Sequence, residues 1–377
     1  MTNTLPPSTP NPALAGVDSP YAWFRLAVSL LLMTVGNGAM WVIPVVLPVV
    51  QKDFGVGRAE AALPYTLMML GFGLGGIIMG RLADRFGLFV PLVLAAFATG
   101  SGFMLAGMST GILGFALAHG LLIGLLGSSV TFAPLMADTA LWFARRRGIA
   151  VAVCASGNYL AGTIWPPIVQ HFVETAGWRS TYLGVGVVCC LSMLLLAPLM
   201  RRRSPLQPSA MVKPGARLNA ERPFGLSPHT ATLALCLAGV ACCVAMAMPQ
   251  VHIVAYCTDL GYGAARGAEM LSLMLACGIV SRLVSLYLIA ALFGLFQGGI
   301  VPAYAIIVRE YFPASQTGVR VGTVIMFTMV GMALGGWMSG KVFDLTGSYH
   351  AAFLNGVAWN LLNLTIVVLL LRRTMRA

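Results

Sequence analysis

The sequence predicts an all-α, polytopic membrane protein. Three observations support this fold class: the composition, the spacing of long apolar runs, and an internal repeat. The chain has 377 residues, of which 58% are hydrophobic and only 9% charged, whereas soluble domains usually carry about a quarter charged residues. Because one helix needs about 20 apolar residues to cross a bilayer, the chain has room for roughly ten to twelve spans. This composition excludes a disordered protein and argues against a soluble enzyme.

The apolar runs lie between charged or turn-forming segments. They cover residues 23–50, 61–80, 88–108, 112–142, 149–172, 181–200, 231–257, 268–284, 286–308, 319–340 and 350–371. The predicted domains are a disordered cytoplasmic tail (1–22), an N-terminal six-helix bundle (23–200), a cytoplasmic linker (201–230), an incomplete C-terminal bundle (231–371) and a basic tail (372–377).

The net charge of +12 reflects membrane topology rather than nucleic-acid binding. In the first half, eleven basic residues fall in the loops after the second, fourth and sixth runs, against three in the opposite loops. Lys and Arg collect on the cytoplasmic side of membrane proteins. The sequence therefore places the N-terminus and the linker in the cytoplasm, and it predicts no nucleic-acid partner.

The two halves of the chain resemble each other at fixed offsets. Gly177–Arg203 resembles Gly347–Arg373 at an offset of 170, and Asp53–Gly57 resembles Asp259–Gly263 at an offset of 206. Such duplication is typical of secondary transporters. The offsets differ by 36 residues, so the second half is predicted to lack one helix and its loop, the block equivalent to Gly80–Phe115. Eleven spans would remain, and an odd number conflicts with a basic C-terminus in the cytoplasm.

Motifs for other kinds of chemistry are absent from the sequence. It contains no GxxxxGK[ST] phosphate loop, no HExxH pair and no CxxC pair. The eight cysteines lie in or beside apolar runs and are interpreted as small buried residues. The segment Gly71–Gly76 lies inside an apolar run and is interpreted as a close-packing face. We therefore expect no metal, no cofactor and no enzymatic activity.

The segment Gly80–Gly87, which reads G-R-L-A-D-R-F-G, resembles the signature of the major facilitator superfamily. Trp142–Ala150, Ala155–Gly162, Pro249–His252 and Gly278–Arg282 are similar to segments of its bacterial monocarboxylate-porter-like members, including the oxalate–formate antiporter branch. The resemblance implies a six-plus-six helix bundle that works by alternating access, with a cavity lined by helices 1, 4, 7 and 10. It also implies a cytoplasmic gate at Gly80, Asp84, Arg85 and Gly87.

An ionisable residue inside a membrane span is costly, so each one is a functional candidate. Arg282 has no acid four residues away on either side, and its guanidinium suits a carboxylate. The resemblance also assigns it to anion binding, the alternative being that it marks the end of its helix. Asp138 either carries a proton or pairs with Arg145 or Arg146, and His252 either titrates or donates to a backbone carbonyl beside Pro249. Polar residues near prolines and glycines complete the predicted substrate site: Asn37, Trp41, Asn158, Tyr159, Gln250 and Tyr304.

These features together predict a secondary active transporter of a small, monocarboxylate-like organic anion. We expect a monomeric symporter or antiporter in the bacterial inner membrane, with a proton as a candidate coupling ion. One alternative is an exporter of hydrophobic drugs or metabolites from the same superfamily, which few intramembrane charges would suit. The other is a non-transporting remnant or membrane receptor, which the 36-residue deficit would suit.

Overall fold

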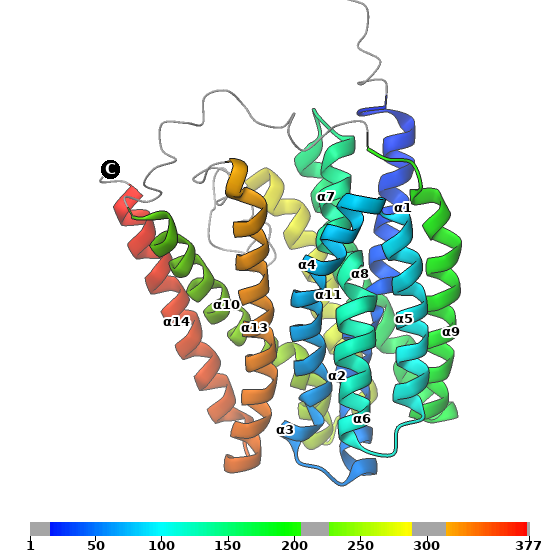
Figure 1. Ribbon diagram of the computed structural model, residues 1–377. Helices are drawn as coiled ribbons and strands as arrows, with labels where there is room; N and C mark the ends of the chain where they lie inside the picture. The colour runs from blue at the N-terminus through cyan, green and yellow to red at the C-terminus, as the bar shows by residue number, and fades with distance from the viewer. Residues whose placement is uncertain (1–15, 205–225, 289–313, 375–377) are drawn as a thin grey trace, which may run out of the picture.

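The computed structural model describes residues 16–204, 226–288 and 314–374, and within these ranges every regular element is a helix. Nine helical segments there are long and apolar enough to span a membrane. They are Pro20–Phe54, Arg58–Phe86, Phe89–Gly107, Ile112–Trp142, Arg147–Ala176, Trp178–Met200, His229–Asp259, Gly322–Thr346 and Tyr349–Arg372. Figure 1 shows them side by side in one bundle, which confirms the all-α, polytopic fold.

The first span is built from two helices, α1 (Pro20–Gly36) and α2 (Gly38–Phe54), which meet at Asn37. It begins three residues before the predicted run because the Ser19 hydroxyl accepts a hydrogen bond from a first-turn N–H at 3.2 Å, and a proline occupies the first helical position. The end of the predicted disordered tail, residues 20–22, is therefore helical.

The other five spans of the N-terminal half follow the predicted runs. The second consists of α3 (Arg58–Ala61) and α4 (Leu63–Phe86), and the third of α5 (Phe89–Gly107). The fourth is irregular: α6 (Ile112–Leu117), the π-helix η2 (Ala118–Gly127), the 3₁₀-helix η3 (Ser128–Thr131) and α7 (Ala133–Trp142). The last two are α8 (Arg147–Ala176) and α9 (Trp178–Leu196), which continues into η4 (Ala197–Met200).

The C-terminal half contains α10 (Pro228–Asp259), α11 (Ala264–Leu288), α13 (Ala314–Thr346) and α14 (Tyr349–Thr374). Most of the predicted run 286–308, and most of the linker, lie outside the described residues. In Figure 1, α11 ends and α13 begins at the same face of the bundle, and α14 ends at the face where α1 begins. We call this arginine-rich face the cytoplasmic face and the opposite one the outer face. The described end of α14 thus lies on the side that a basic C-terminus in the cytoplasm would require.

The helix ends reproduce the repeat found in the sequence. Gly55 and Gly261, which are 206 residues apart, have φ angles of 64° and 82°. Gly177 and Gly347, which are 170 residues apart, have φ angles of 80° and 65°. Positive φ favours glycine and commonly ends a helix. Equivalent glycines thus end equivalent helices in the two halves.

The most extensive contacts between the two halves are made by two equivalent helix pairs, α4 with α13 and α8 with α11, and α2 also contacts α10. Inside the N-terminal half, glycines let α4 approach the π-helix η2. A methyl group added at Gly71 or Gly75 would lie 2.1 Å from the carbonyl oxygen of Gly120 or Leu125. This contact confirms the interpretation of the glycine-rich segment as a close-packing face.

Candidate functional site

The two halves touch near the outer face and separate toward the cytoplasmic face. Along α4, a methyl group added at Gly73 would lie 3.1 Å from a side chain of α13, and one added at Gly340 of α13 would lie 3.0 Å from the backbone of Ala59. Gly76 and Gly80 continue the stripe begun by Gly73, at i+3 and i+7. No described atom lies within 4 Å of a methyl group at either position. The described residues of α4 and α13 therefore pack closely near the outer face and lie further apart toward the cytoplasmic face.

Two interrupted helices meet in the middle of the N-terminal half. The Ser128 hydroxyl donates to the carbonyl oxygen of Gly36 at 2.7 Å, where α1 ends. The Thr131 hydroxyl lies 3.5 Å from the side-chain oxygen of Asn37. Breaks of this kind free polar groups at membrane depth, and transporters build substrate sites around them. We therefore place the candidate substrate site beside these two breaks.

Several polar atoms in the middle of the bundle have no partner among the described residues. They are Nδ2 of Asn37, Oδ1 of Asn158, Oε1 of Gln250 and Oη of Tyr65. Because buried polar groups are almost always hydrogen-bonded, each of these atoms is a possible contact for a bound solute or water. The first three were predicted as substrate residues, whereas Tyr65 was missed.

Two other predicted substrate residues adjoin this region. The indole Nε1 of Trp41 donates to the carbonyl oxygen of Asn158 at 3.0 Å, which ties α2 to α8. Trp41 is buried, whereas Tyr159, the residue after Asn158 on α8, is half-buried. The role of Trp41 in the structure is thus to hold the broken first span against the fifth, and substrate contact by either residue stays a prediction.

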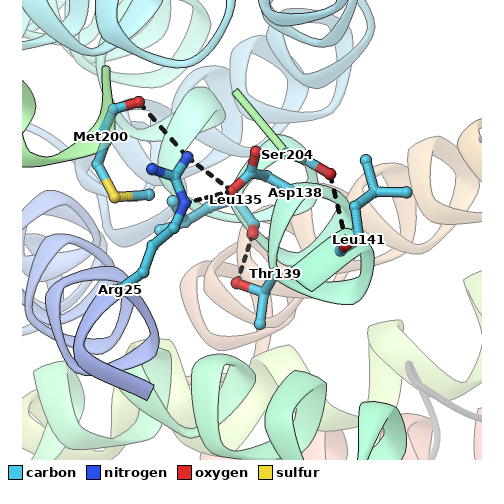
Figure 2. Close-up of polar contacts among 7 residues, drawn as sticks. All are labelled: Arg25, Leu135, Asp138, Thr139, Leu141, Met200 and Ser204. Atoms are coloured by element: carbon cyan, nitrogen blue, oxygen red, sulfur yellow. Dashed lines mark hydrogen bonds and ion pairs between the residues drawn. The ribbon is translucent and has the colours of Figure 1, made fainter. Parts of the chain in front are cut away.

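Asp138 on α7 pairs with Arg25 on α1 (Figure 2). The Nε and Nη2 atoms of Arg25 lie 3.1 and 2.9 Å from Oδ2 of Asp138, and Nη2 also lies 3.4 Å from the carbonyl oxygen of Met200. The predicted partners, Arg145 and Arg146, were wrong. They lie beyond the end of α7 with exposed side chains, whereas Asp138 faces α1. The pair joins the cytoplasmic ends of three helices, and proton transfer by Asp138 stays a prediction.

Arg58, at the start of α3, crosses from the N-terminal half to the C-terminal half. Its Nη2 lies 3.2 Å from Oδ1 of Asp259, and its Nη1 donates to the hydroxyl of Tyr349 at 2.9 Å. The backbone N–H groups of Arg58 and Ala59 donate to the carboxylate of Asp344 at 2.8 and 2.9 Å. We call Arg58, Asp259, Asp344 and Tyr349 the outer cluster.

His252 on α10 adjoins the outer cluster rather than the candidate substrate site. Its Nε2 lies 2.8 Å from the carbonyl oxygen of Gly336, and its Nδ1 lies 3.3 Å from the hydroxyl of Tyr349. If Nε2 donates to the carbonyl, Nδ1 accepts from the tyrosine. Both ring nitrogens therefore have protein partners in this arrangement. The backbone carbonyl that His252 contacts is that of Gly336 on α13, not one beside Pro249 as predicted.

Comparison with known proteins identifies the family. The family model for the Major Facilitator Superfamily matches residues 28–290, well over half of the chain. The chain belongs to this superfamily. It is therefore a multi-pass membrane transporter for a small molecule and not an enzyme.

Individual members of the superfamily resemble the chain at modest identity. Monocarboxylate transporter 6 of Mus musculus is 26% identical over 287 residues, a match that covers 72% of this chain but only 61% of the mouse protein. Monocarboxylate transporter 11 of Homo sapiens is 25% identical over 397 residues, covering 92% of this chain and 82% of the human one. The crystal structure of the human organic anion transporter MFSD10 (TETRAN) superposes with a TM-score of 0.61 at 15% identity, covering 93% of this chain and all of that one. The structural likeness supports the fold.

The superfamily signature segment, Gly80–Gly87, ends α4 at the cytoplasmic face. Gly87 has a φ of 79° and ends the helix, and the side chains of Asp84 and Arg85 are exposed. The carbonyl oxygen of Arg85 accepts from Arg203 at 3.2 Å. Within the described ranges, no hydrogen bond joins Asp84 to the C-terminal half. The segment therefore lies at the cytoplasmic end of α4, where a cytoplasmic gate would be, and the gating roles stay predictions.

Two predicted substrate residues cannot be placed in full. Tyr304 lies outside the described residues. Arg282 lies in α11, but its side chain is outside the described part. The repeat offset pairs Arg282 with Gly76, ten residues before the end of α4 at Phe86. At 1.5 Å per residue, the backbone of Arg282 is thus about 15 Å of helix away from the level where α4 ends.

Sequence reasoning missed Arg25 and the outer cluster. Arg58 was read only as a topology signal, because it stands at the end of an apolar run. One signal was available: the repeat aligns Arg179 with Tyr349, so the second copy has no basic residue at the position equivalent to the partner of Asp53. An aspartate without its repeat partner indicates that a cation from elsewhere approaches it.

Proposed function

We propose that the chain is a secondary active transporter that moves a small organic anion, of the monocarboxylate class, by alternating access. The observation that carries the proposal is the pair of broken helices at Asn37 and Ser128–Thr131, with unpartnered polar atoms beside them. The arrangement of α4 and α13, closed outside and parted inside, suits alternating access between the two faces.

The anion class is supported by charge and by the relatives. Asp138, the acid predicted inside the membrane, is neutralised by Arg25, so it does not repel an anion at the candidate site. Arg282 would supply the cation: it lies in α11, six residues before the helix ends at Leu288, and the repeat offset pairs it with Gly76 of α4. Two relatives carry the name monocarboxylate transporter. We propose that Arg282 binds the carboxylate and that Asp84 and Arg85 serve the cytoplasmic gate.

We also propose that the transporter works as a monomer in a bacterial inner membrane. The strong bias of basic residues toward one face supports the orientation with the N-terminus in the cytoplasm. A symport or antiport mode, with a proton as the coupling ion, is part of the same proposal.

The test is uptake of radiolabelled lactate into proteoliposomes that contain the purified protein. Because the guanidinium would hold the substrate carboxylate, Arg282→Ala should lower uptake about tenfold or more, and Arg282→Lys should keep part of it. The matched control is Arg179→Ala, which removes an exposed arginine at the outer face. Unchanged uptake in Arg282→Ala would remove the anion-site assignment. Dye efflux without lactate uptake would favour the drug exporter, and a folded protein that moves neither would favour the remnant.

A further inference from the structure

Asp344 bridges the two halves at the outer face through the backbone as well as through charge. Its two carboxylate oxygens accept the N–H groups of Arg58 and Ala59 at 2.8 and 2.9 Å. The close approach depends on Gly340, one turn earlier on α13, because a methyl group there would lie 3.0 Å from the Ala59 backbone. The outer end of α13 is thus fitted to the start of the second span.

The pairing of Arg58 with Asp259 replaces a contact that the other repeat makes within one half. Asp53, the repeat equivalent of Asp259, pairs with Arg179 of its own half at 2.7 Å. The residue equivalent to Arg179 in the second half is Tyr349. Asp259 therefore takes its guanidinium from Arg58, which belongs to the opposite half. The equivalent aspartates thus pair within one half in the first repeat and between the halves in the second.

The segment that carries Asp344 also resembles the cytoplasmic signature segment. Gly340–Gly347 reads G-K-V-F-D-L-T-G, and Gly80–Gly87 reads G-R-L-A-D-R-F-G. Both share the pattern G-[RK]-x-x-D-x-x-G at the C-terminal end of a helix, and their final glycines have φ angles of 65° and 79°. One segment ends α13 at the outer face, where its aspartate is bonded. The other ends α4 at the cytoplasmic face, where its aspartate is exposed.

We infer that the outer cluster, together with Gly340, is a latch that holds the outer face closed in this inward-open arrangement and must break each time the transporter opens outward. The four bonds of the latch join residues of opposite halves, so separating the outer ends breaks all of them at once. Arg58 is 6% exposed and its guanidinium lies 4.8 Å from the ring of Phe343, so opening also transfers a charge into water. The inference rests on alternating access and not on the identity of the substrate.

The latch stabilises the inward-open state relative to the outward-open state. Its loss is therefore measurable as a change in the populations of these two states. A hydrogen bond to a charged group contributes more than a neutral one, because the charge strengthens the attraction. Asp344→Asn keeps the shape of the side chain and removes its charge. We expect it to raise the ratio of outward-open to inward-open molecules about tenfold.

The experiment measures distances between spin labels by pulsed electron resonance in nanodiscs. Thr110→Cys and Tyr262→Cys place the two labels on exposed residues at the outer ends of the N-terminal and C-terminal halves, in a Cys277→Ser background because Cys277 is exposed. Asp344→Asn should add a population with longer distances. Gly340→Ala, which keeps every charge but obstructs the close approach, should shift the distances in the same direction and provides a second variant if the first fails to fold.

The matched control is Asp53→Asn, which makes the same chemical change in the equivalent pair that lies within one half. It should leave the distance distribution unchanged. An equal shift in both aspartate variants, or no shift in Asp344→Asn and Gly340→Ala, would overturn the latch. The measurement needs no substrate, so a failure of the latch is distinguishable from a failure of lactate uptake, which would remove only the proposed anion transport.

Discussion

Asp53 and Asp259 lie at the outer end of the first span of each half, yet the ion pairs that they form differ in burial and in location. The pair of Asp53 with Arg179 is exposed, with side chains 43% and 40% accessible for arginine and aspartate, and both residues belong to one half. In the pair of Asp259 with Arg58, the arginine side chain is only 8% accessible, and the residues come from opposite halves. Exposed pairs contribute about 0–1 kcal/mol, whereas a pair between moving bodies acts on their relative populations. The equivalent aspartates thus differ in whether their arginine belongs to the same half, and the proposed latch depends on this difference.

The largest expected effect is a loss of stability, and it tests whether burial of an ion pair matters separately from its position between the two halves. Arg25 and Asp138 form a pair that is buried but lies within one half, so its loss should affect folding and not the balance of states. Arg25→Ala leaves a carboxylate uncompensated and should cost about 3–5 kcal/mol of stability. Thermal unfolding and the yield of monodisperse protein would measure this loss.

The exposed pair supplies the control for that measurement. Arg179→Ala removes a pair with the same chemistry at an accessible site and should cost at most about 1 kcal/mol. Equal costs for the two variants would show that burial is not what distinguishes the pairs. A change of the outer distance distribution in Arg25→Ala would show that this pair, too, takes part in gating.

A charge exchange tests whether Arg58 and Asp259 act on each other directly. Arg58→Asp and Asp259→Arg should each raise the outward-open fraction about tenfold, because each replaces an attractive pair by two neighbouring like charges in the closed state. The double variant restores opposite charges and should recover most of the inward-open population. Double-mutant analysis of the spin-label distances gives the coupling. Purely additive shifts in the double variant would contradict a direct contact.

The smallest expected effect comes from giving the second repeat the arginine that the first repeat has at the equivalent position. Tyr349→Arg gives Asp259 a cation in its own half, equivalent to Arg179, so Arg58 must compete for the carboxylate. The outward-open fraction should rise severalfold, since one of the four latch bonds is weakened and the bond to the tyrosine hydroxyl is lost. Tyr349→Phe, which removes only the hydroxyl, should shift the distances less. A larger shift in Tyr349→Phe would indicate that the hydroxyl matters more than the competition.

The candidate site was partly predictable because some polar residues stand out beside breaks in helices. Asn37 lies between two glycines in an apolar run, and the structure breaks the first span there. The break in the fourth span at Ser128–Thr131 went unpredicted, since π-helices depend on how neighbouring helices pack and leave little trace in the local sequence. His252 was a functional candidate because it is a titratable residue in a predicted span, but both of its ring nitrogens are hydrogen-bonded within the protein.

The sequence by itself determined where the helices lie, that they span a membrane, and that the chain is a duplicated transporter. Apolar runs must satisfy their own backbone in lipid, so helical spans follow directly from composition. Only the tertiary structure decided which charges meet. Arg25 reaches Asp138 across 113 positions of sequence, and Arg58 reaches Asp259 across 201. Such partners are set by which helix ends converge in space, and convergence depends on the packing of whole helices rather than on local pattern.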